Sequence, residues 1–137
     1  MSIPNNFKGL CIDFLYAYSD IETIRTNKEL DNKINNLSKD IINIIPTEEV
    51  KNFKQKDLQQ YKGTKLENEC ILCTKGNESK SISLLRHLRN SIAHGNLHQN
   101  GNYFELEDWD NSKKDNLTAL GKFDKNRIKR LLELFRQ

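Results

Sequence analysis

Apolar side chains recur at steps of three and four residues along the first third of this 137-residue chain. The first set is Phe7, Leu10, Cys11, Phe14, Leu15, Tyr18 and Ile21. Steps of three and four place side chains on one face of an α-helix, so the sequence predicts an amphipathic helix over residues 6–25. A second set is Leu30, Ile34, Leu37, Ile41, Ile44 and Ile45. It predicts another helix that ends before Pro46, because the residue preceding proline avoids the α region. Such helices must bury their apolar faces against one another.

The middle of the chain is less regular. Thr47 is a suitable N-cap for a shorter helix over about 48–61. Glycines and mixed polarity follow, and only the stretch from Leu66 to Cys73 could form a short helix or strand. The two cysteines Cys70 and Cys73 have the spacing of metal ligands, but structural zinc needs four ligands and no second pair exists. We therefore expect no metal and no cofactor.

A fourth helix opens at Ser79 or Ser81 and carries an apolar face. This face is formed by Ile82, Leu85, Leu88, Ile92 and Ala93. Gly95 stands where a left-handed C-terminal cap is expected, so His94 falls in the last turn.

After this helix the apolar period changes to two. Phe104 and Leu106 alternate with polar residues, and Asn100-Gly101 separates two extended stretches, which predicts a β-hairpin. Residues 116–123 can add a third strand. Asp124 can then cap a final helix with an apolar side. The fold class expected is mainly α, a helical bundle with a small antiparallel hairpin.

Bulk properties restrict the class of protein further. A chain of this length is about one domain, so we expect a single domain over residues 1–137. The net charge of +3 is too small to indicate a nucleic-acid binder by itself. No leader peptide and no membrane-spanning run is recognised, and three cysteines do not form a disulfide framework. These features predict a soluble, cytoplasmic protein.

Polar groups suited to phosphodiester chemistry converge on the fourth predicted helix. Asn90 and His94 are neighbours one turn apart, and steps of three and four connect Arg86 to Arg89 and Asn90. Arginine pairs with phosphate through a planar fork, and histidine exchanges protons near neutral pH. RNA supplies its own nucleophile, the 2′-OH. An enzyme then needs a base, an acid and a cation, but no metal.

The segment "RNSIAHGN", from Arg89 to Asn96 within "LLRHLRNSIAHGNL", closely resembles the signature of the HEPN superfamily of compact helical bundles. The family pattern is an arginine, usually a polar residue next, and a histidine four to six residues on. The strong match covers about 14 residues, and the chain looks most like small stand-alone bacterial members with a hairpin after the motif helix. The resemblance implies a metal-independent endoribonuclease that leaves a 2′,3′-cyclic phosphate, acting as a toxin or antiphage effector. It implies that Arg89 holds the phosphate, Asn90 orients the histidine or phosphate, and His94 is the acid or base.

The resemblance also implies partners. HEPN proteins commonly dimerise with their motif helices facing each other, and transesterification needs two proton-transfer groups where one chain's motif supplies one. We therefore expect RNA as substrate, a homodimer, and possibly a nucleotidyltransferase-type antitoxin. Two alternatives stay open: a non-catalytic HEPN-like module that binds RNA, a nucleotide or a protein, and a helical scaffold.

Other polar residues near the motif are weaker candidates for catalysis or RNA binding. His87 is expected at the surface or in an interface rather than in catalysis, and His98 is either an exposed histidine or an RNA contact. Arg86 is equally suited to RNA or to a salt bridge. Ser91 is expected to allow close helix packing, with a phosphate hydrogen bond as the lesser possibility.

Two charged runs complete the prediction. Lys129 and Arg130 lie on the last predicted helix, where a solvated face is the default and an RNA-tracking patch is the alternative. The acidic run from Glu105 to Asp110 is expected on a solvent-facing strand edge rather than at a metal.

Overall fold

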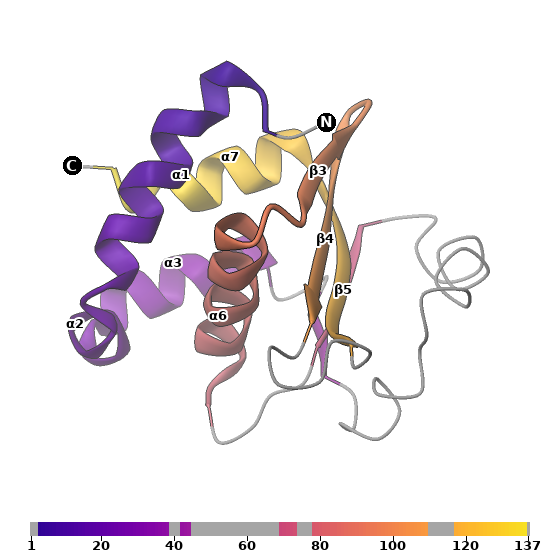
Figure 1. Ribbon diagram of the computed structural model, residues 1–137. Coiled ribbons are helices and arrows are strands. Elements are labelled where there is room, and N and C mark those ends of the chain that lie inside the picture. Colours follow the sequence, from indigo (N-terminus) through magenta and orange to yellow (C-terminus); the bar gives the residue numbers. More distant parts are fainter. Residues whose placement is uncertain (1–2, 39–41, 45–68, 74–77, 110–116, 137) are drawn as a thin grey trace.

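The computed structural model describes residues 3–38, 42–44, 69–73, 78–109 and 117–136 (Figure 1). The helices described are α1 (Asn5–Tyr18), α2 (Ile21–Thr26), α3 (Lys28–Ser38), α6 (Lys80–Ala93) and α7 (Lys125–Glu133). The strands described are β1 (Ile42–Ile44), β2 (Cys70–Cys73), β3 (Leu97–Asn100), β4 (Tyr103–Trp109) and β5 (Leu117–Asp124). The mainly α prediction with a hairpin after the motif helix is confirmed, since β3 and β4 follow α6 directly.

The strands form one sheet in the order β1-β2-β5-β4-β3. The β1-β2 pair is parallel, and the other neighbours are antiparallel. Figure 1 shows the described helices on one side of this sheet. The sheet is larger than the predicted hairpin because β5, foreseen as a third strand, connects the hairpin to β2 and β1. β4 is therefore an inner strand, with β3 at the edge.

The hairpin turn is as tight as predicted, but it is shifted by one residue. Asn100 pairs with Tyr103, so Gly101 and Asn102 form the loop. Gly101 has φ of +63°. A positive φ at the first loop residue is what a two-residue type II′ hairpin requires, and glycine adopts it without steric cost.

Two predicted helix boundaries are wrong. The helix expected over 6–25 is divided at Ser19 and Asp20, where the hydroxyl of Ser19 donates to the Tyr16 carbonyl and Asp20 leaves helical dihedral angles before α2 begins. The helix expected to reach Pro46 ends at Ser38, and 42–44 form β1 instead. Pairing with β2, distant in sequence, overrides the helical spacing of these isoleucines. The helix predicted over 48–61 lies outside the described residues.

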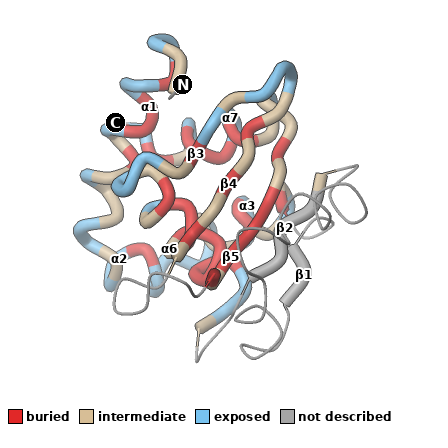
Figure 2. Tube along the Cα trace, turned by 45° about the vertical axis from the view of Figure 1, so that its right-hand side comes forward, coloured by how far each residue is buried: buried red, intermediate tan, exposed pale blue. Residues whose placement is uncertain are grey.

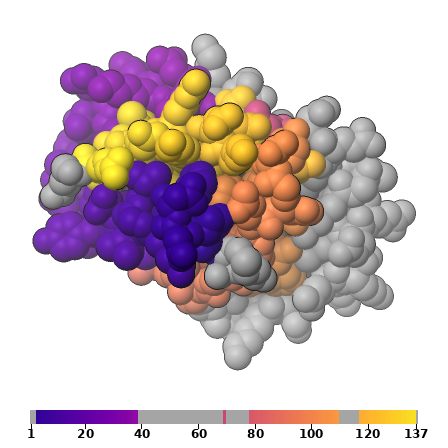
Figure 3. All heavy atoms as spheres, turned by 90° about the horizontal axis from the view of Figure 1, so that it is seen from above, coloured from indigo at the N-terminus to yellow at the C-terminus, as the bar shows by residue number. Residues whose placement is uncertain are grey.

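The core lies between the helices and the sheet, as the buried segments in Figure 2 show. Aromatic rings connect its parts: Phe7 packs on Phe104 at 4.9 Å between centroids, and Phe14 meets Phe135 edge-on at 5.0 Å. Seen from above, α1, α7 and the hairpin lie side by side (Figure 3). Burial alternates along β4, where Phe104, Leu106 and Asp108 are buried on the face toward the helices.

Candidate functional site

The ends of the motif helix α6 are set by local chemistry. The Ser79 side chain accepts a hydrogen bond from the Ile82 backbone N–H, so Ser79 is the N-cap. At the other end Gly95 has φ of +72°, the left-handed conformation expected of a C-terminal cap. His94 is the C-cap residue of α6, and its backbone N–H donates to the Asn90 carbonyl at 3.0 Å. The caps therefore place His94 where the helix ends.

Arg89, Asn90 and His94 lie along the outward side of α6. Arg89 and His94 are exposed, and Asn90 is half-buried between them. The Arg89 Nη1 donates to the Asn90 Oδ1 at 3.0 Å. Among the described residues, the His94 side chain makes no hydrogen bond or ion pair. The arginine is thus held by its neighbour, whereas the histidine faces solvent within the described part of the chain.

Asn90 points its other end into the protein. Its Nδ2 donates to the Asp108 Oδ2 on β4 at 3.2 Å. The same oxygen lies 2.7 Å from the Nδ1 of His87. Asn90 therefore connects the exposed arginine to a buried carboxylate, and not to the side chain of His94.

The expectation that His87 lies at the surface or in an interface is wrong. Its side chain is fully buried, and Asp108 is only 3% exposed. His87 occupies the same side of α6 as Leu84, Leu88 and Ser91, all of them buried. A histidine in this position cannot touch a substrate, but it can organise the residues that do.

Sequence reasoning missed the His87–Asp108 pair, although both residues carried a signal. Asp108 stands two residues after Leu106 in the alternating pattern of β4, which assigns it to the buried face. The solvent-facing edge expected for the acidic run is wrong for this residue, because β4 is inside the sheet and its Asp108 faces the helices. Asp110 lies outside the described residues.

Arg86 takes part in an ion-pair cluster at the start of the motif helix. Its Nε lies 2.6 Å from a Glu78 oxygen, and Arg25 reaches the other oxygen of Glu78 at 3.8 Å. Tyr18 lies within electrostatic range of this cluster and of Arg89: burial raises the pKa of Tyr18, Glu78 adds to the rise, and the arginines oppose it. Of the two readings of Arg86, the salt bridge is the one observed.

Ser91 does not have the accessibility that an RNA contact needs. The side chain is fully buried, and its hydroxyl lies 2.8 Å from the His87 carbonyl and 2.7 Å from the Glu107 carbonyl. The RNA-binding possibility for Ser91 is therefore wrong. The packing role is confirmed, since this hydroxyl joins α6 to β4.

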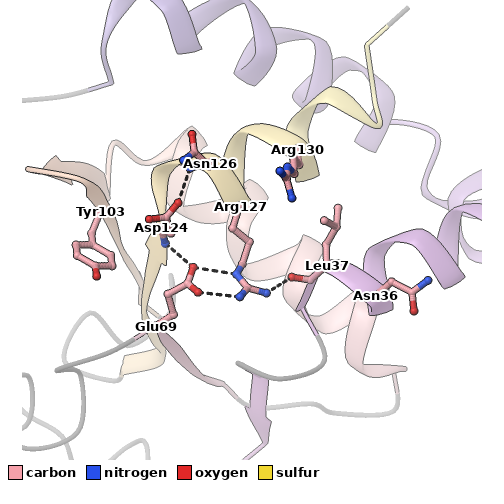
Figure 4. Close-up of a pocket in the computed structure, with 8 residues that line it drawn as sticks. All are labelled: Asn36, Leu37, Glu69, Tyr103, Asp124, Asn126, Arg127 and Arg130. Atoms are coloured by element: carbon pink, nitrogen blue, oxygen red, sulfur yellow. Dashed lines mark hydrogen bonds and ion pairs between the residues drawn. The ribbon is translucent and has the colours of Figure 1, made fainter.

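The final helix presents Lys129 and Arg130 to solvent. Asp124 caps it by accepting from the Asn126 N–H at 2.8 Å. Figure 4 shows a polar hollow of about 360 Å³ beside this cap, in which Arg127 is paired with both oxygens of Glu69 at 2.8 Å and donates to the Leu37 carbonyl. Arg130 lines the same hollow outside these contacts. Arg127 is thus a structural clamp, whereas Arg130 is exposed and makes no ion pair with the described part of the chain.

The remaining candidates lie apart from the motif strip. His98 is exposed on the edge strand β3, directly opposite Glu105 of β4. Within the described ranges, no group of three His, Cys, Asp or Glu side chains could hold a metal ion. None of the helices in those ranges is long and apolar enough to cross a bilayer.

Comparison with known proteins gives one match. No curated protein and no solved structure matches the chain. The family model described as HEPN pEK499 p136 matches residues 8–137, which include the whole of the motif helix, the hairpin and α7. The match suggests a nuclease-like or RNA-related module. The chain therefore belongs to the HEPN pEK499 p136 family, within the HEPN superfamily.

Proposed function

We propose that the protein is a metal-independent endoribonuclease that cleaves RNA by transesterification and leaves a 2′,3′-cyclic phosphate. The observation that carries the proposal is the exposure of Arg89 and His94 near the C-terminal end of α6, with Arg89 held by Asn90 at 3.0 Å. A held guanidinium can receive a scissile phosphate, and an exposed imidazole five residues further along the helix can exchange a proton with the 2′-OH or the departing 5′-oxygen.

The reaction divides among these groups as follows. A base removes the proton from the 2′-OH, whose oxygen attacks phosphorus. Arg89 stabilises the negative charge that develops on the phosphorane oxygens. An acid then protonates the departing 5′-oxygen. His94 supplies one of the two proton transfers.

Transesterification needs a second proton-transfer group besides His94, and a second copy of the chain can supply it. We propose a homodimer in which two motif helices face each other, because a two-fold axis brings a second His94 to the site without a further residue type. The single domain would act in the cytoplasm as a toxin or antiphage effector, with a nucleotidyltransferase-type antitoxin as its candidate neutralising partner. Lys129, Arg130 and His98, all exposed, would extend the contact with RNA.

Incubation of the purified protein with total RNA in EDTA tests the activity. Cleavage with cyclic-phosphate ends is expected for the wild type, and His94→Ala should lower the rate by about 10² to 10⁴ if its role is proton transfer. Lys33→Ala is the matched control, because it removes an exposed side chain from α3, paired only across one turn with Glu29. Cleavage that survives His94→Ala would refute the assignment. Binding of RNA without any cleavage would favour the non-catalytic module instead.

A further inference from the structure

The buried pair His87–Asp108 joins the motif helix to the sheet beneath it. The two side chains are 0% and 3% exposed, in that order, and the Nδ1 of His87 lies 2.7 Å from the Asp108 Oδ2. The nearest residues on the same face of β4 are Phe104 and Leu106, both fully buried. The pair therefore continues a buried face of β4 whose preceding members are apolar, with the buried Ser91 as its polar neighbour on α6.

Packing alone gives no reason for such a pair. Apolar residues of similar volume in place of a buried ionic pair are often neutral or stabilising, because two polar groups must lose their water. A valine at residue 108 and a leucine at residue 87 would continue the apolar faces of β4 and α6. The reason for the pair has to lie in what it holds.

On the side toward solvent, the His87–Asp108 pair binds the side chain of Asn90. The Asp108 Oδ2 that faces His87 also accepts from the Asn90 Nδ2 at 3.2 Å. An amide group is planar, so a fixed Nδ2 also fixes the direction of Oδ1. That Oδ1 accepts from the Arg89 Nη1 at 3.0 Å. Four side chains thus form one continuous chain of hydrogen bonds from the core to the surface.

We propose that His87 and Asp108 are positioning residues, which act through Asn90 to hold the Arg89 guanidinium in the orientation that receives the scissile phosphate. The inference rests on the proposed ribonuclease function for its effect on catalysis. The ordering of Arg89 itself does not depend on that function. A charged partner makes the chain stronger than a neutral one, since hydrogen bonds to a carboxylate are the shorter and stronger kind.

The kinetic test compares variants in full-length protein. Asn90→Ala and Asp108→Val each break the chain and should lower kcat by about 10- to 100-fold, as expected for a misplaced group, with little change in KM. Asp108→Asn keeps a side-chain oxygen for both donors and should retain more of the rate than Asp108→Val. In the Asn90→Ala background, Asp108→Asn should have no further effect on kcat.

The control addresses a merely structural role. Thr118→Val removes a hydroxyl that donates to the Asp108 carbonyl at 3.0 Å and leaves the carboxylate in place. It should cost stability and leave kcat unchanged. A loss of activity in Thr118→Val equal to that in Asp108→Asn would show that general loosening of β4 explains the effect, and would overturn the proposal.

Nuclear spin relaxation of the Arg89 Nε–H separates this proposal from the ribonuclease assignment. We expect the order parameter of Arg89 to fall in folded Asp108→Asn and Asn90→Ala, while that of Arg130 stays the same. If neither wild type nor variants cleave RNA but Arg89 loses its order, the positioning chain stands and the ribonuclease function fails. If Arg89 stays ordered in both variants, or an active enzyme keeps its kcat when that order is lost, the positioning role is refuted.

Discussion

The cost of separating His87 from Asp108 can be worked out from their burial. His87→Leu would leave the Asp108 carboxylate, 3% exposed, with the Asn90 amide as its remaining partner among the described residues. Asp108→Val would leave the buried Nδ1 of His87 without its acceptor at 2.7 Å. Leaving a buried group of this kind without its hydrogen-bond partner costs about 3 kcal/mol, against a total stability of about 5–15 kcal/mol for a typical domain.

The double variant His87→Leu/Asp108→Val should behave differently. Both members of the 2.7 Å contact are then removed together, and Asn90, only half-buried, can turn to water. We expect the double variant to cost less than about 2 kcal/mol, hence less than either single change. The coupling between the two sites should therefore be several kcal/mol, well above the few tenths found between independent positions.

Urea unfolding at a fixed protein concentration measures these differences. The single tryptophan, Trp109, follows Asp108 on β4 and reports on this region by fluorescence, with far-ultraviolet circular dichroism as the second probe. With an m-value of about 1.5 kcal/mol/M, a loss of 3 kcal/mol moves the midpoint by about 2 M. Additive single and double effects, or single changes that cost under about 1 kcal/mol, would refute the reasoning that this pair is energetically coupled.

Three further outcomes follow from single residues. Gly95→Ala should destabilise the protein by about 1–2 kcal/mol in thermal unfolding, because the backbone has φ of +72° and the added Cβ meets no atom within 4 Å. Gly9→Ala lies inside α1 and is equally unobstructed, so it should stabilise the protein by about 0.5–1 kcal/mol. Effects of the same sign in both variants would contradict this conformational argument. Burial raises the pKa of Cys11 from 9.0 to about 11. The thiol therefore loses its proton at a lower pH in the unfolded chain than in the folded protein. The extra free energy of unfolding of wild type over Cys11→Ala should be fully present below pH 9 and should fall as the pH rises to 11. A difference that does not depend on pH would exclude this linkage. Lys129→Ala and Arg130→Ala should each reduce the slope of log affinity for single-stranded RNA against log salt by about 0.7 if they touch phosphates, and unchanged slopes would remove α7 from the interface.

Features controlled by neighbours along the chain could be predicted from the sequence. The cap side chains of Ser79 and Asp124 accept hydrogen bonds from backbone N–H groups three and two residues on, and the left-handed Gly95 ends a helix whose apolar spacing is visible in the sequence. The hairpin and its glycine turn were equally accessible. The motif residues Arg89, Asn90 and His94 were found because they lie within six consecutive positions of one predicted helix.

Features controlled by distant segments could not. Ile44 continues the helical spacing of Leu37 and Ile41, but it lies in β1, whose Ile42 pairs with Ile71 of β2, and the sequence does not indicate this distant partner. The link from Asn90 to Asp108 joins residues that are 18 apart in the chain. The periods of α6 and β4 assign His87 and Asp108 to buried faces, but nothing in the sequence indicates that the two side chains meet.

The sequence by itself determined the helices, their caps, the hairpin and the identity of the exposed motif, because contacts within about four residues decide these features. Only the tertiary structure decided which polar residues are buried together. A buried carboxylate is tolerable only beside a hydrogen-bond donor, and the donor at residue 87 is brought to residue 108 by the packing of a helix on a sheet. The same packing supports Arg89 through the side-chain amide of Asn90, which the sequence had predicted to orient His94 or the phosphate.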